Sequence, residues 1–278
     1  MAFFPPGLVW LASYPKSGNT WMRVLLSNLL ADAAEPASIN NLSAETTLGS
    51  CWRFGDDMLV DADLFDGEEL ERMRALHCDS VAAGLTSPFF CKTHERFEGH
   101  AGTPVLGTGA RAAVYIVRDP RDVAISLSHH ASASLDEAIA LMADEKRVIG
   151  GGLQVLQLLG DWPSHASGWT EQSRTPIKVV RYEDMHRDAF GTFQSVIAFL
   201  NGHATEAEIQ RAVANSRLEE LQRQETEKGF RERMQGQERF FRSGRTGEWK
   251  DVLTLGQIRT IEERFGPVMT CFGYQTNT

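Results

Sequence analysis

Residues 8–30 read LVWLASYPKSGNTWMRVLLSNLL, and this stretch decides how the chain begins to fold. The apolar run Leu8–Ala12 predicts a buried strand. Pro15, Gly18 and Asn19 then interrupt the run, as the residues of a tight loop do. From Thr20 onward the apolar residues recur at the spacing of one helix face, at Met22, Leu25, Leu26, Leu29 and Leu30. The stretch therefore predicts a strand, a tight loop and a helix.

The loop between this strand and helix is polar and carries Lys16, Ser17 and Thr20. The first backbone N–H groups of a helix have no partner inside the helix and carry partial positive charge, so they bind anions. A lysine and two hydroxyls beside these donors predict a cradle for a phosphate group. An ordinary strand-to-helix turn with a solvated lysine is the alternative interpretation.

The phosphate cradle differs from a Walker A loop, which has the pattern G-x-x-x-x-G-K-[ST]. Here Lys16 precedes Gly18 instead of following it, and the first glycine of that pattern is missing. The hydroxyl of a Walker A loop holds Mg²⁺, whereas nothing in this loop calls for a metal. A nucleotide kinase is thus an alternative that the displaced lysine disfavours.

Residues 14–21, Y-P-K-S-G-N-T-W, resemble the nucleotide-sulfate-binding loop of the PAPS-dependent sulfotransferases, whose usual form is Y-P-K-[SA]-G-[TN]-T-W. PAPS is 3′-phosphoadenosine 5′-phosphosulfate, the sulfate donor of that family. The resemblance implies a P-loop-like fold, PAPS as co-substrate, no metal, and a catalytic role for Lys16. It also implies that the nucleotide is bound by Lys16, Ser17, Gly18, Asn19, Thr20 and Trp21.

A second motif, V-R-D-P-R-D-V-A-I-S at 117–126, resembles the family pattern R-[ND]-P-x-D-x-x-x-S. The resemblance implies that Arg118 and Ser126 hold the 3′-phosphate. A guanidinium forks onto phosphate oxygens and a hydroxyl adds a donor, so the residue types suit this role. Arg121 is interpreted as a surface charge. His129 and His130 are interpreted as paired or solvated residues, not ligands.

Two further segments resemble the family's adenine and 3′-phosphate contacts. Tyr182 opens Y-E-D, whose tyrosine meets the adenine end of the nucleotide. Ser216 and Leu218 stand where the family has Thr/Ala-Ser-Phe, and a leucine there shifts base stacking toward Trp21. The pattern F-R-x-G-x-x-G-x-W-K at 241–250 resembles the C-terminal nucleotide loop, which implies contacts from Phe241, Arg242, Ser243 and Gly244, with Trp249 as an anchor.

A catalytic pair is predicted at the end of the strand Pro88–His94. In parallel sheets ligands bind beyond the carboxyl ends of the strands, and Lys92 and His94, two residues apart, point to the same side. K-T-H resembles the family's K-x-H, which implies that His94 is the general base and that Lys92 supports the sulfuryl oxygens. Glu95 and Arg96 replace the common Leu-Pro, so the acceptor side is expected to differ. A structural histidine is the alternative.

The strands expected near 8–14, 88–93, 112–118 and 177–182 alternate with helices, which predicts an α/β three-layer sandwich around a central parallel sheet. A length of 278 residues suits a single domain over 1–278. Capping signals predict helix starts at Asp66, Asp119, Ser134, Thr205 and Thr254. Residues 150–162 are interpreted as a hinged lid or as part of a helix–loop–helix, and 222–240 as a solvated surface or loop.

The composition narrows the function class. A net charge of −9 argues against a general nucleic-acid binder, so a nucleotide site must be made positive locally. No apolar run approaches the length of a membrane span and no basic signal-peptide start is present, which predicts a cytoplasmic protein without membrane contact. Four scattered cysteines without C-x-x-C are expected to be reduced and mostly buried. Homo-oligomerisation is left open.

Together the motifs predict transfer of a sulfuryl group from PAPS to a hydroxyl of a small-molecule acceptor, a phenol or alcohol such as a bacterial natural product. A carbohydrate or lipid acceptor, a P-loop-like nucleotide kinase and a catalytically inactive nucleotide sensor are the alternatives. The acceptor site is expected from residues 36–66, 95–109 and 131–165, none of which identifies the acceptor.

Overall fold

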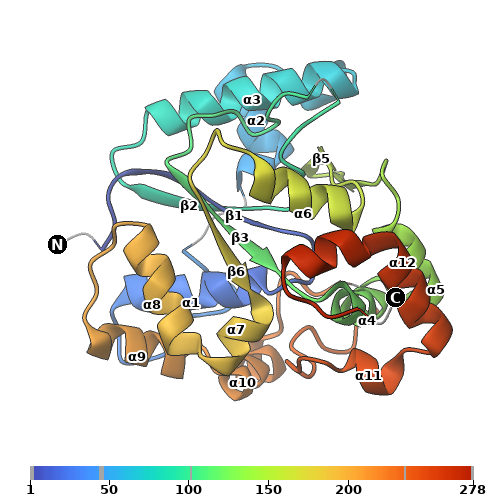
Figure 1. Cartoon of the computed structure of the whole chain (residues 1–278). Coiled ribbons are helices and arrows are strands. Elements are labelled where there is room, and N and C mark those ends of the chain that lie inside the picture. Colours follow the sequence, from blue (N-terminus) through green and yellow to red (C-terminus); the bar gives the residue numbers. More distant parts are fainter. Residues whose placement is uncertain (1–2, 44–46, 101, 235, 277–278) are drawn as a thin grey trace.

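Four parallel strands form the central sheet of the computed structural model, which describes residues 3–43, 47–100, 102–234 and 236–276. They are β1 (Gly7–Ser13), β2 (Pro88–Thr93), β3 (Ala112–Val117) and β6 (Ile177–Arg181). β1 pairs with β2 and with β3, and β3 pairs with β6, giving the order β2-β1-β3-β6 (Figure 1). The predicted parallel sheet is confirmed, and each strand begins and ends close to its expected bounds.

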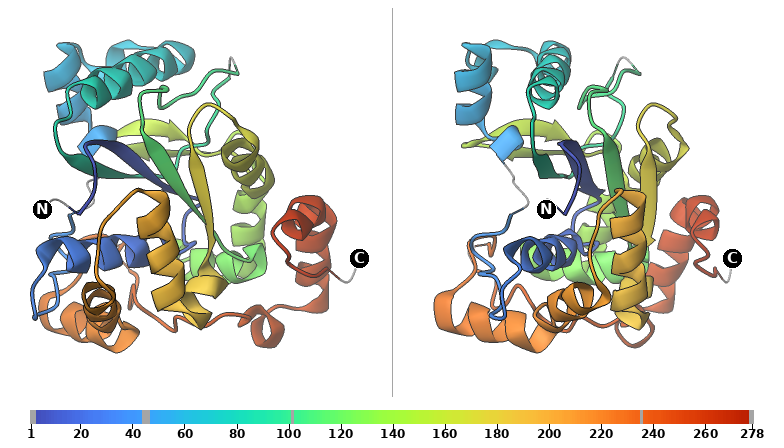
Figure 2. Two further views of the ribbon diagram at one scale, coloured as in Figure 1. Left: turned by 60° about the vertical axis from the view of Figure 1, so that its left-hand side comes forward. Right: turned by 90° about the vertical axis from the view of Figure 1, so that its left-hand side faces the viewer.

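Helices cover both faces of the sheet, which confirms the predicted three layers (Figures 1 and 2). Alternate residues of the buried strand β1 face the two layers, because side chains alternate along a strand. Val9 and Leu11 pack toward α1 (Asn19–Ala31), α8 (Ala189–Phe199) and α9 (Glu206–Ala214). Trp10 and Ala12 belong to the other core, which includes residues from α4 (Pro120–Ala131), α5 (Leu135–Met142), α6 (Trp162–Glu171) and α12 (Leu255–Cys271).

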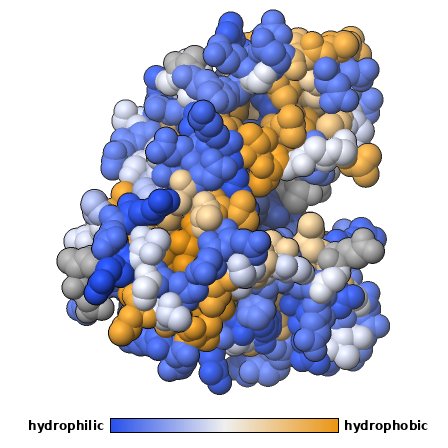
Figure 3. Space-filling view, turned by 90° about the vertical axis from the view of Figure 1, so that its right-hand side faces the viewer, coloured by the Kyte–Doolittle hydropathy of each residue, from blue (hydrophilic) through white to orange (hydrophobic). Residues whose placement is uncertain are grey.

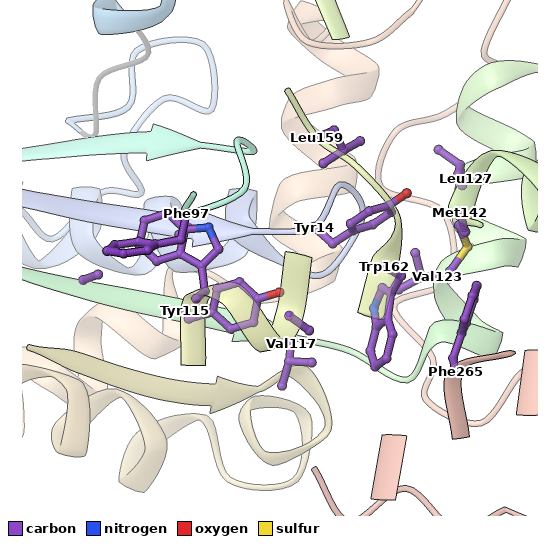
Figure 4. Close-up of a cluster of buried hydrophobic side chains, with 14 of the residues drawn as sticks. Tyr14, Phe97, Tyr115, Val117, Val123, Leu127, Met142, Leu159, Trp162 and Phe265 are labelled. Carbon is purple, nitrogen blue, oxygen red and sulfur yellow. The ribbon is translucent and has the colours of Figure 1, made fainter. Parts of the chain in front are cut away.

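Large aromatic side chains fill this second core (Figure 4). The rings of Trp162 and Phe265 stack with centroids 5.9 Å apart, and Tyr115 stacks on Trp169 at 6.2 Å. Tyr115 is fully buried, and its hydroxyl is hydrogen-bonded to Nδ1 of His165 at 2.9 Å. This aromatic layer contacts the residues that follow β1 and β2, because His165 packs on Tyr14 and bonds to the His94 carbonyl.

The strand order explains where ligands can bind. From β1 the chain passes to β2 on one side and later to β3 on the other side. A crevice forms outside the carboxyl ends where the strand order reverses in this way. The loop after β1, the segment after β2 and the segment after β3 therefore leave the sheet at one edge and surround one place.

The remaining elements confirm most predicted caps. Helix α3 (Gly67–Ala83) has the capping box at Asp66. Ser134, Thr205 and Thr254 form capping boxes, and Asp119 caps α4. The other helices are α2 (Cys51–Met58), α7 (Tyr182–Arg187), α10 (Leu218–Lys228) and α11 (Trp249–Val252), with short turns η1 (Thr47–Gly49) and η2 (Ala62–Leu64).

The helix–loop–helix expected around residues 150–162 is wrong. Helix α5 ends at Met142, and the chain then forms an antiparallel hairpin of β4 (Val148–Gly151) and β5 (Gln154–Leu158). Gly151 pairs with Gln154, so Gly152 and Leu153 make the turn of this hairpin, and the φ of 64° at Gly152 favours glycine there. Gly150 and Gly151, with φ values of 101° and 90°, end β4, where the pairing register shifts. The lid stays a prediction.

Two other expectations need correction. Arg121 is buried, not a surface charge, because α12 packs on α4 and brings Glu262 within 2.6 Å of Nη1, while Asp119 lies 2.7 Å from Nη2. The described part of residues 222–240 is only partly the solvated surface or loop that was expected, although Arg223, Arg231 and Arg239 are exposed. The segment begins inside α10, and Phe230 and Phe240 then pack with centroids 4.7 Å apart in a small core.

The four cysteines are free, with Cys78 and Cys91 buried, Cys51 half-buried and Cys271 exposed. Within the ranges that the structure describes, no helix combines the length and apolar character needed to cross a bilayer.

Candidate functional site

A cavity of about 1070 Å³ lies at the edge of the sheet where the segments that follow β1, β2 and β3 meet. Its walls include residues of every predicted motif, together with the β4–β5 hairpin on one side and α10 and the chain after it on the other. Figure 3 shows a cleft that separates the upper part of the molecule from the lower part. The cavity is therefore large enough and central enough to bring the separate motifs into one site.

The loop after β1 makes a tight turn onto the start of α1. Lys16 and Gly18 both have positive φ, 70° and 106°, and Gly18 is the N-cap residue of α1. The Lys16 Nζ atom lies 4.0 Å from the centre of the Phe240 ring. Burial, reinforced by the cations Lys92 and Arg118, lowers the pKa of Lys16 to about 7. A bound anion would raise this pKa again, because it favours the charged form.

The remaining loop residues have different surroundings. Asn19 donates its Nδ2 to the Leu11 carbonyl (2.8 Å) and to Ser13 Oγ (3.2 Å), so its side chain ties the helix start to β1. Ser17 Oγ is buried and has no hydrogen-bond partner among the described residues. Thr20 lines the cavity. Buried polar groups normally have partners, so an unpaired hydroxyl beneath a lysine-bearing helix start fits a loop that binds an anion.

Gly18 leaves no room for a side chain, which gives a first testable prediction. A Cβ at this position would lie 2.6 Å from Cδ2 of Tyr182, and the φ of 106° is unfavourable for other residues. Because this loop resembles a PAPS-binding loop, we expect Gly18→Ala to weaken binding of PAP, the 3′,5′-bisphosphate that PAPS leaves after losing its sulfuryl group, at least tenfold, since Tyr182 or the loop must move. Gly67→Ala is the matched control, since a Cβ there meets nothing within 4 Å. Calorimetric titration of both variants checks the prediction; equal affinities would contradict it.

The segment after β3 contributes Arg118, and α4 contributes Ser126 to the cavity wall. The Arg118 guanidinium donates to the carbonyls of Lys16 (3.3 Å) and Arg245 (2.9 Å) and lies over the Tyr182 ring at 4.4 Å. It therefore links the loop after β1 to the C-terminal loop. Arg118 and Ser126 both face the cavity, as the resemblance requires for residues that contact one phosphate.

The C-terminal loop is tied to α4. Both carboxylate oxygens of Asp122 accept backbone hydrogen bonds, from Gly247 (2.6 Å) and Trp249 (2.9 Å). The Arg121 guanidinium lies 3.8 Å from the centre of the Trp249 ring, so the tryptophan is held where the sequence expected an anchor. Within the loop, Glu248 holds Arg242 in a two-point ion pair (2.7 and 2.5 Å).

The other predicted residues of this loop also meet the cavity. Ser243 donates its hydroxyl to Glu248 at 3.1 Å. Gly244 has a φ of 59°, and a Cβ there would lie 2.9 Å from Leu218, so the two residues pack closely. Phe241 is buried against Phe230, with ring centroids 5.1 Å apart. A phosphate bound by Arg242 would have to compete with Glu248.

The predicted adenine end is built from Trp21, Tyr182, Ser216 and Leu218, which all line the cavity. Trp21 and Tyr182 pack edge to face at 5.8 Å, and the Trp21 indole donates to the Ser216 carbonyl (3.1 Å). The Tyr182 hydroxyl donates to the Gly244 carbonyl (3.1 Å). The Ser216 hydroxyl bonds within the protein, to the Ala212 carbonyl, so Ser216 positions Trp21 through its backbone.

His94 faces the cavity from the end of β2 in a defined tautomer. Its Nδ1 lies 2.7 Å from the Ser13 carbonyl oxygen. A carbonyl only accepts hydrogen bonds, so Nδ1 carries the proton and Nε2 is the nitrogen that can accept one. Burial, followed by repulsion from Lys92, keeps the pKa of His94 well below its usual value. The ring is thus neutral at pH 7, the state that a general base needs.

Glu232 is a cavity residue that the sequence analysis missed. Its carboxylate pairs with Lys92 Nζ at 3.1 Å and with Arg23 Nη1 at 2.5 Å. Burial alone would raise the pKa of Glu232, but these two cations outweigh burial and lower it to about 2. No motif marked Glu232, because it lies among many similar charges. The aromatic residues Phe230 and Phe240 on either side of it were the available signal.

The acceptor side also differs from expectation. Of the three segments expected to line it, only 131–165 does so among the described residues, through Arg147, Ile149, Gly150, Gln154 and Gln157. The described residues of 36–66 and 95–109 do not line the cavity. His130 lines the cavity as well and pairs with Gln237 Oε1 at 3.2 Å, in line with its interpretation as a paired residue. No group of three or more potential metal ligands occurs within the described part of the chain.

Comparison with known proteins identifies the family. A family model described as "Sulfotransferase domain" matches residues 6–273. The chain belongs to the sulfotransferase family. The resemblance of the Y-P-K-S-G-N-T-W loop is thereby confirmed at the family level, and the α/β fold with a central parallel sheet is the one that sulfotransferase structures share.

Similar members of the sulfotransferase family include animal and plant proteins. Sulfotransferase 2B1 of Mus musculus is 22% identical over 268 residues, which cover 91% of this chain and 69% of that protein. Cytosolic sulfotransferase 12 of Arabidopsis thaliana is 27% identical over 272 residues, covering 92% of this chain and 76% of that protein. The structure of retinol dehydratase with androsterone and PAP matches with a TM-score of 0.60 at 21% identity, covering 98% and 82% of the two chains.

Proposed function

We propose that this sulfotransferase-family protein transfers the sulfuryl group of PAPS to the hydroxyl of a small-molecule acceptor, a phenol or alcohol. Bound PAPS would supply the sulfuryl group, and PAP, the 3′,5′-bisphosphate of adenosine, would be released. The acceptor oxygen would bond to sulfur as the bond between sulfur and the bridging phosphate oxygen breaks. The donor set of the cavity suits such a nucleotide, because lysine, arginine and hydroxyl groups gather from three chain segments.

The observation that carries the proposal is the tautomer of His94. Since Nδ1 is committed to the Ser13 carbonyl at 2.7 Å, the neutral ring offers Nε2 as the proton acceptor. In the proposed reaction Nε2 takes the proton of the acceptor hydroxyl as its oxygen attacks. The low pKa of His94, caused by burial and Lys92, keeps this nitrogen available at neutral pH.

Other residues of the chain have supporting roles in the proposal. Lys16 lies in the loop that would hold the 5′-phosphate and stabilises the charge that develops on the leaving oxygen. Lys92 supports the sulfuryl oxygens, and Arg118 with Ser126 and Arg242 holds the 3′-phosphate. Trp21 and Tyr182 face the adenine. A cytoplasmic location and a single domain over 1–278 stay predictions.

The decisive experiment is incubation with ³⁵S-labelled PAPS and panels of phenols, alcohols, carbohydrates and lipids, followed by detection of labelled products. Labelled phenol or alcohol supports the proposal, and label confined to a carbohydrate or lipid would replace the acceptor class. A thermal-shift comparison of PAP with MgATP tests the kinase alternative. A ligand at 100 times its Kd stabilises the folded state by about 2.7 kcal/mol, so PAP should raise Tm and MgATP should not.

The pKa of Lys16 leads to a prediction about pH. With a pKa of about 7, Lys16 is protonated below pH 7 and neutral above it in the free protein. A bound phosphate favours the charged form, so binding above pH 7 must take up a proton. We therefore expect PAP affinity to be nearly constant from pH 6.5 to 7 and to fall above pH 7, by up to about tenfold per pH unit.

Calorimetric titration at pH 8 in buffers of different ionisation enthalpy checks this prediction by counting the protons taken up on PAP binding. The expected uptake approaches one proton. A Kd that stays constant up to pH 9, without proton uptake, would show that Lys16 is already charged in the free protein.

A further inference from the structure

Arg147 is a cavity cation that none of the nucleotide motifs includes. It precedes β4 and lines the cavity from the side of the hairpin, where the side chain is half-buried. Its position is well defined, because its carbonyl accepts hydrogen bonds from the backbone N–H groups of Leu159 (2.9 Å) and Gly160 (3.0 Å). The sequence resemblance assigns the two phosphates of the nucleotide to other residues, so Arg147 is an additional positive charge.

The Arg147 guanidinium has only neutral partners among the described residues. Its Nη1 donates to the Tyr14 hydroxyl at 3.1 Å and to the Leu141 carbonyl at 3.4 Å. In the described ranges, no carboxylate oxygen lies within 4.0 Å of a guanidinium nitrogen of Arg147, the distance that defines an ion pair. Lys92 and Arg242, by contrast, are paired with Glu232 and Glu248. A half-buried cation with spare donors, facing a cavity, is suited to an anion that arrives with a ligand.

Arg147 lines the same cavity as His94, and both residues bond to the end of β1 and the residue after it. Its partner Tyr14 follows Ser13, whose carbonyl accepts the hydrogen bond from His94. His130 lines the same cavity, and the cations around it include Arg147. Burial and then Lys16, Lys92 and Arg147 lower the pKa of His130 to about 4. An acceptor whose hydroxyl reaches His94 can therefore place another group near Arg147.

The surroundings of Arg147 describe the rest of such an acceptor. Ile149, Met234 and Phe240 provide apolar cavity surface, which suits a flat hydrocarbon or aromatic body. Gln154 and Gln157 add neutral amides on the hairpin. The wall is therefore mixed: apolar side chains together with a charged guanidinium and neutral amides.

On the basis of the proposed function, we propose that the acceptor is a hydroxy acid, whose carboxylate or equivalent anion is bound by Arg147 while its hydroxyl is presented to His94. The planar guanidinium can form two parallel hydrogen bonds with a carboxylate. A neutral sterol or a simple alcohol would leave the charge of Arg147 without an anionic partner when it is bound. Arg147 is thus a specificity-determining residue for the acceptor, not for the nucleotide.

Three phenols of similar size test the proposal: 3-(4-hydroxyphenyl)propionate, its methyl ester, and tyramine. We expect the wild-type protein to sulfate the acid with a kcat/KM roughly 10- to 100-fold above that of the ester, the range expected for hydrogen bonds to a charged group, and tyramine least well. Arg147→Gln should remove the preference for the acid over the ester. Arg147→Lys, which keeps the charge but loses the fork, should retain part of it.

Two control variants separate charge recognition from structural effects. Lys146→Gln removes the neighbouring exposed cation and should keep the full preference. Tyr14→Phe removes the hydroxyl partner of Arg147 but leaves the guanidinium, so it should keep the preference as well. If Tyr14→Phe abolishes the preference as fully as Arg147→Gln does, Arg147 acts through Tyr14 and the proposal is overturned.

Binding measurements distinguish failure of this inference from failure of the proposed reaction. The Kd of PAP, measured by calorimetry, should be the same for wild type and Arg147→Gln; a loss of PAP affinity equal to the loss for the acid would assign Arg147 to the nucleotide instead. If none of the three phenols is sulfated, the acid and ester are titrated into the PAP-loaded protein. Tighter binding of the acid that depends on Arg147 supports the inference even then, and equal binding of both refutes it.

Discussion

His94→Ala is expected to lower kcat for sulfuryl transfer by about 10²- to 10⁴-fold, the contribution typical of a general base. The variant removes the imidazole whose Nε2 is the proton acceptor in the proposed reaction. Nδ1 of His94 is bound to the Ser13 carbonyl at 2.7 Å, so Nε2 alone accepts the proton. The nucleotide motifs do not include His94, and the Kd of PAP should therefore change little.

A second histidine variant controls for the loss of an imidazole as such. His203→Ala alters an exposed residue far along the chain and should retain wild-type kcat. Initial rates with saturating PAPS, measured from pH 5 to 9, complete the test, because the variant should lose any acidic limb that reports His94. If His94→Ala sulfates its acceptor at near the wild-type rate, another group is the base.

Lys16→Met is expected to have the second large effect, lowering kcat/KM for PAPS by about 10²- to 10³-fold, as removal of one charge-stabilising donor does in other enzymes. Lys16 is held by the positive-φ turn of its loop and lies 4.0 Å from the Phe240 ring. Methionine keeps the aliphatic stem and the contact with Phe240 but cannot stabilise a leaving phosphate. Unlike His94→Ala, this variant should also weaken PAP binding.

The proton count gives the Lys16 variant an independent readout. If Lys16 is the group that takes up a proton when PAP binds above pH 7, uptake should disappear in Lys16→Met. Lys228→Met, at the exposed end of α10, is the matched control and should retain both activity and proton uptake. Unchanged proton uptake in Lys16→Met would assign the titration to another cavity group, with Lys92 the first to examine.

The sequence was sufficient for the parts of the molecule whose geometry is local. The loop after β1 depends on glycine, lysine and helix-capping positions within a few residues, and its conformation follows from them. The capping boxes at Ser134, Thr205 and Thr254 have the same local basis. The two central strands, β1 and β3, were recognisable because both of their faces are buried, which makes each an apolar run. The edge strands β2 and β6 are only partly buried and carry shorter apolar runs.

The hairpin at 148–158 was beyond sequence reasoning for a physical reason. Its strands are short, and three consecutive glycines with positive φ end β4 and enter its turn. A glycine triplet can end a helix or make a hinge as well as a turn, so composition does not choose among them. The choice depends on the pairing of β4 with β5.

Two charged residues have partners that are distant in the sequence, and one of them, Arg121, was misread as a surface charge. Arg121 pairs with Glu262, 141 residues away, and Lys92 pairs with Glu232, 140 residues away. A lone charge in a sequence is most often solvated, and only the packing of α12 on α4, or of the chain after α10 on the cavity, changes that expectation.

The amino-acid sequence alone was enough to place the strand, turn and helix of residues 8–30 and the parallel sheet, because short-range backbone preferences and apolar periodicity encode them. The family followed from the resemblance of short motifs. The folded chain was needed to show that Nδ1 of His94 is bound by Ser13, that Glu232 neutralises Lys92, and that Arg147 faces the cavity without a carboxylate among the described residues. These features arise where segments far apart in the chain meet, and their charges are defined by neighbours that no local pattern encodes.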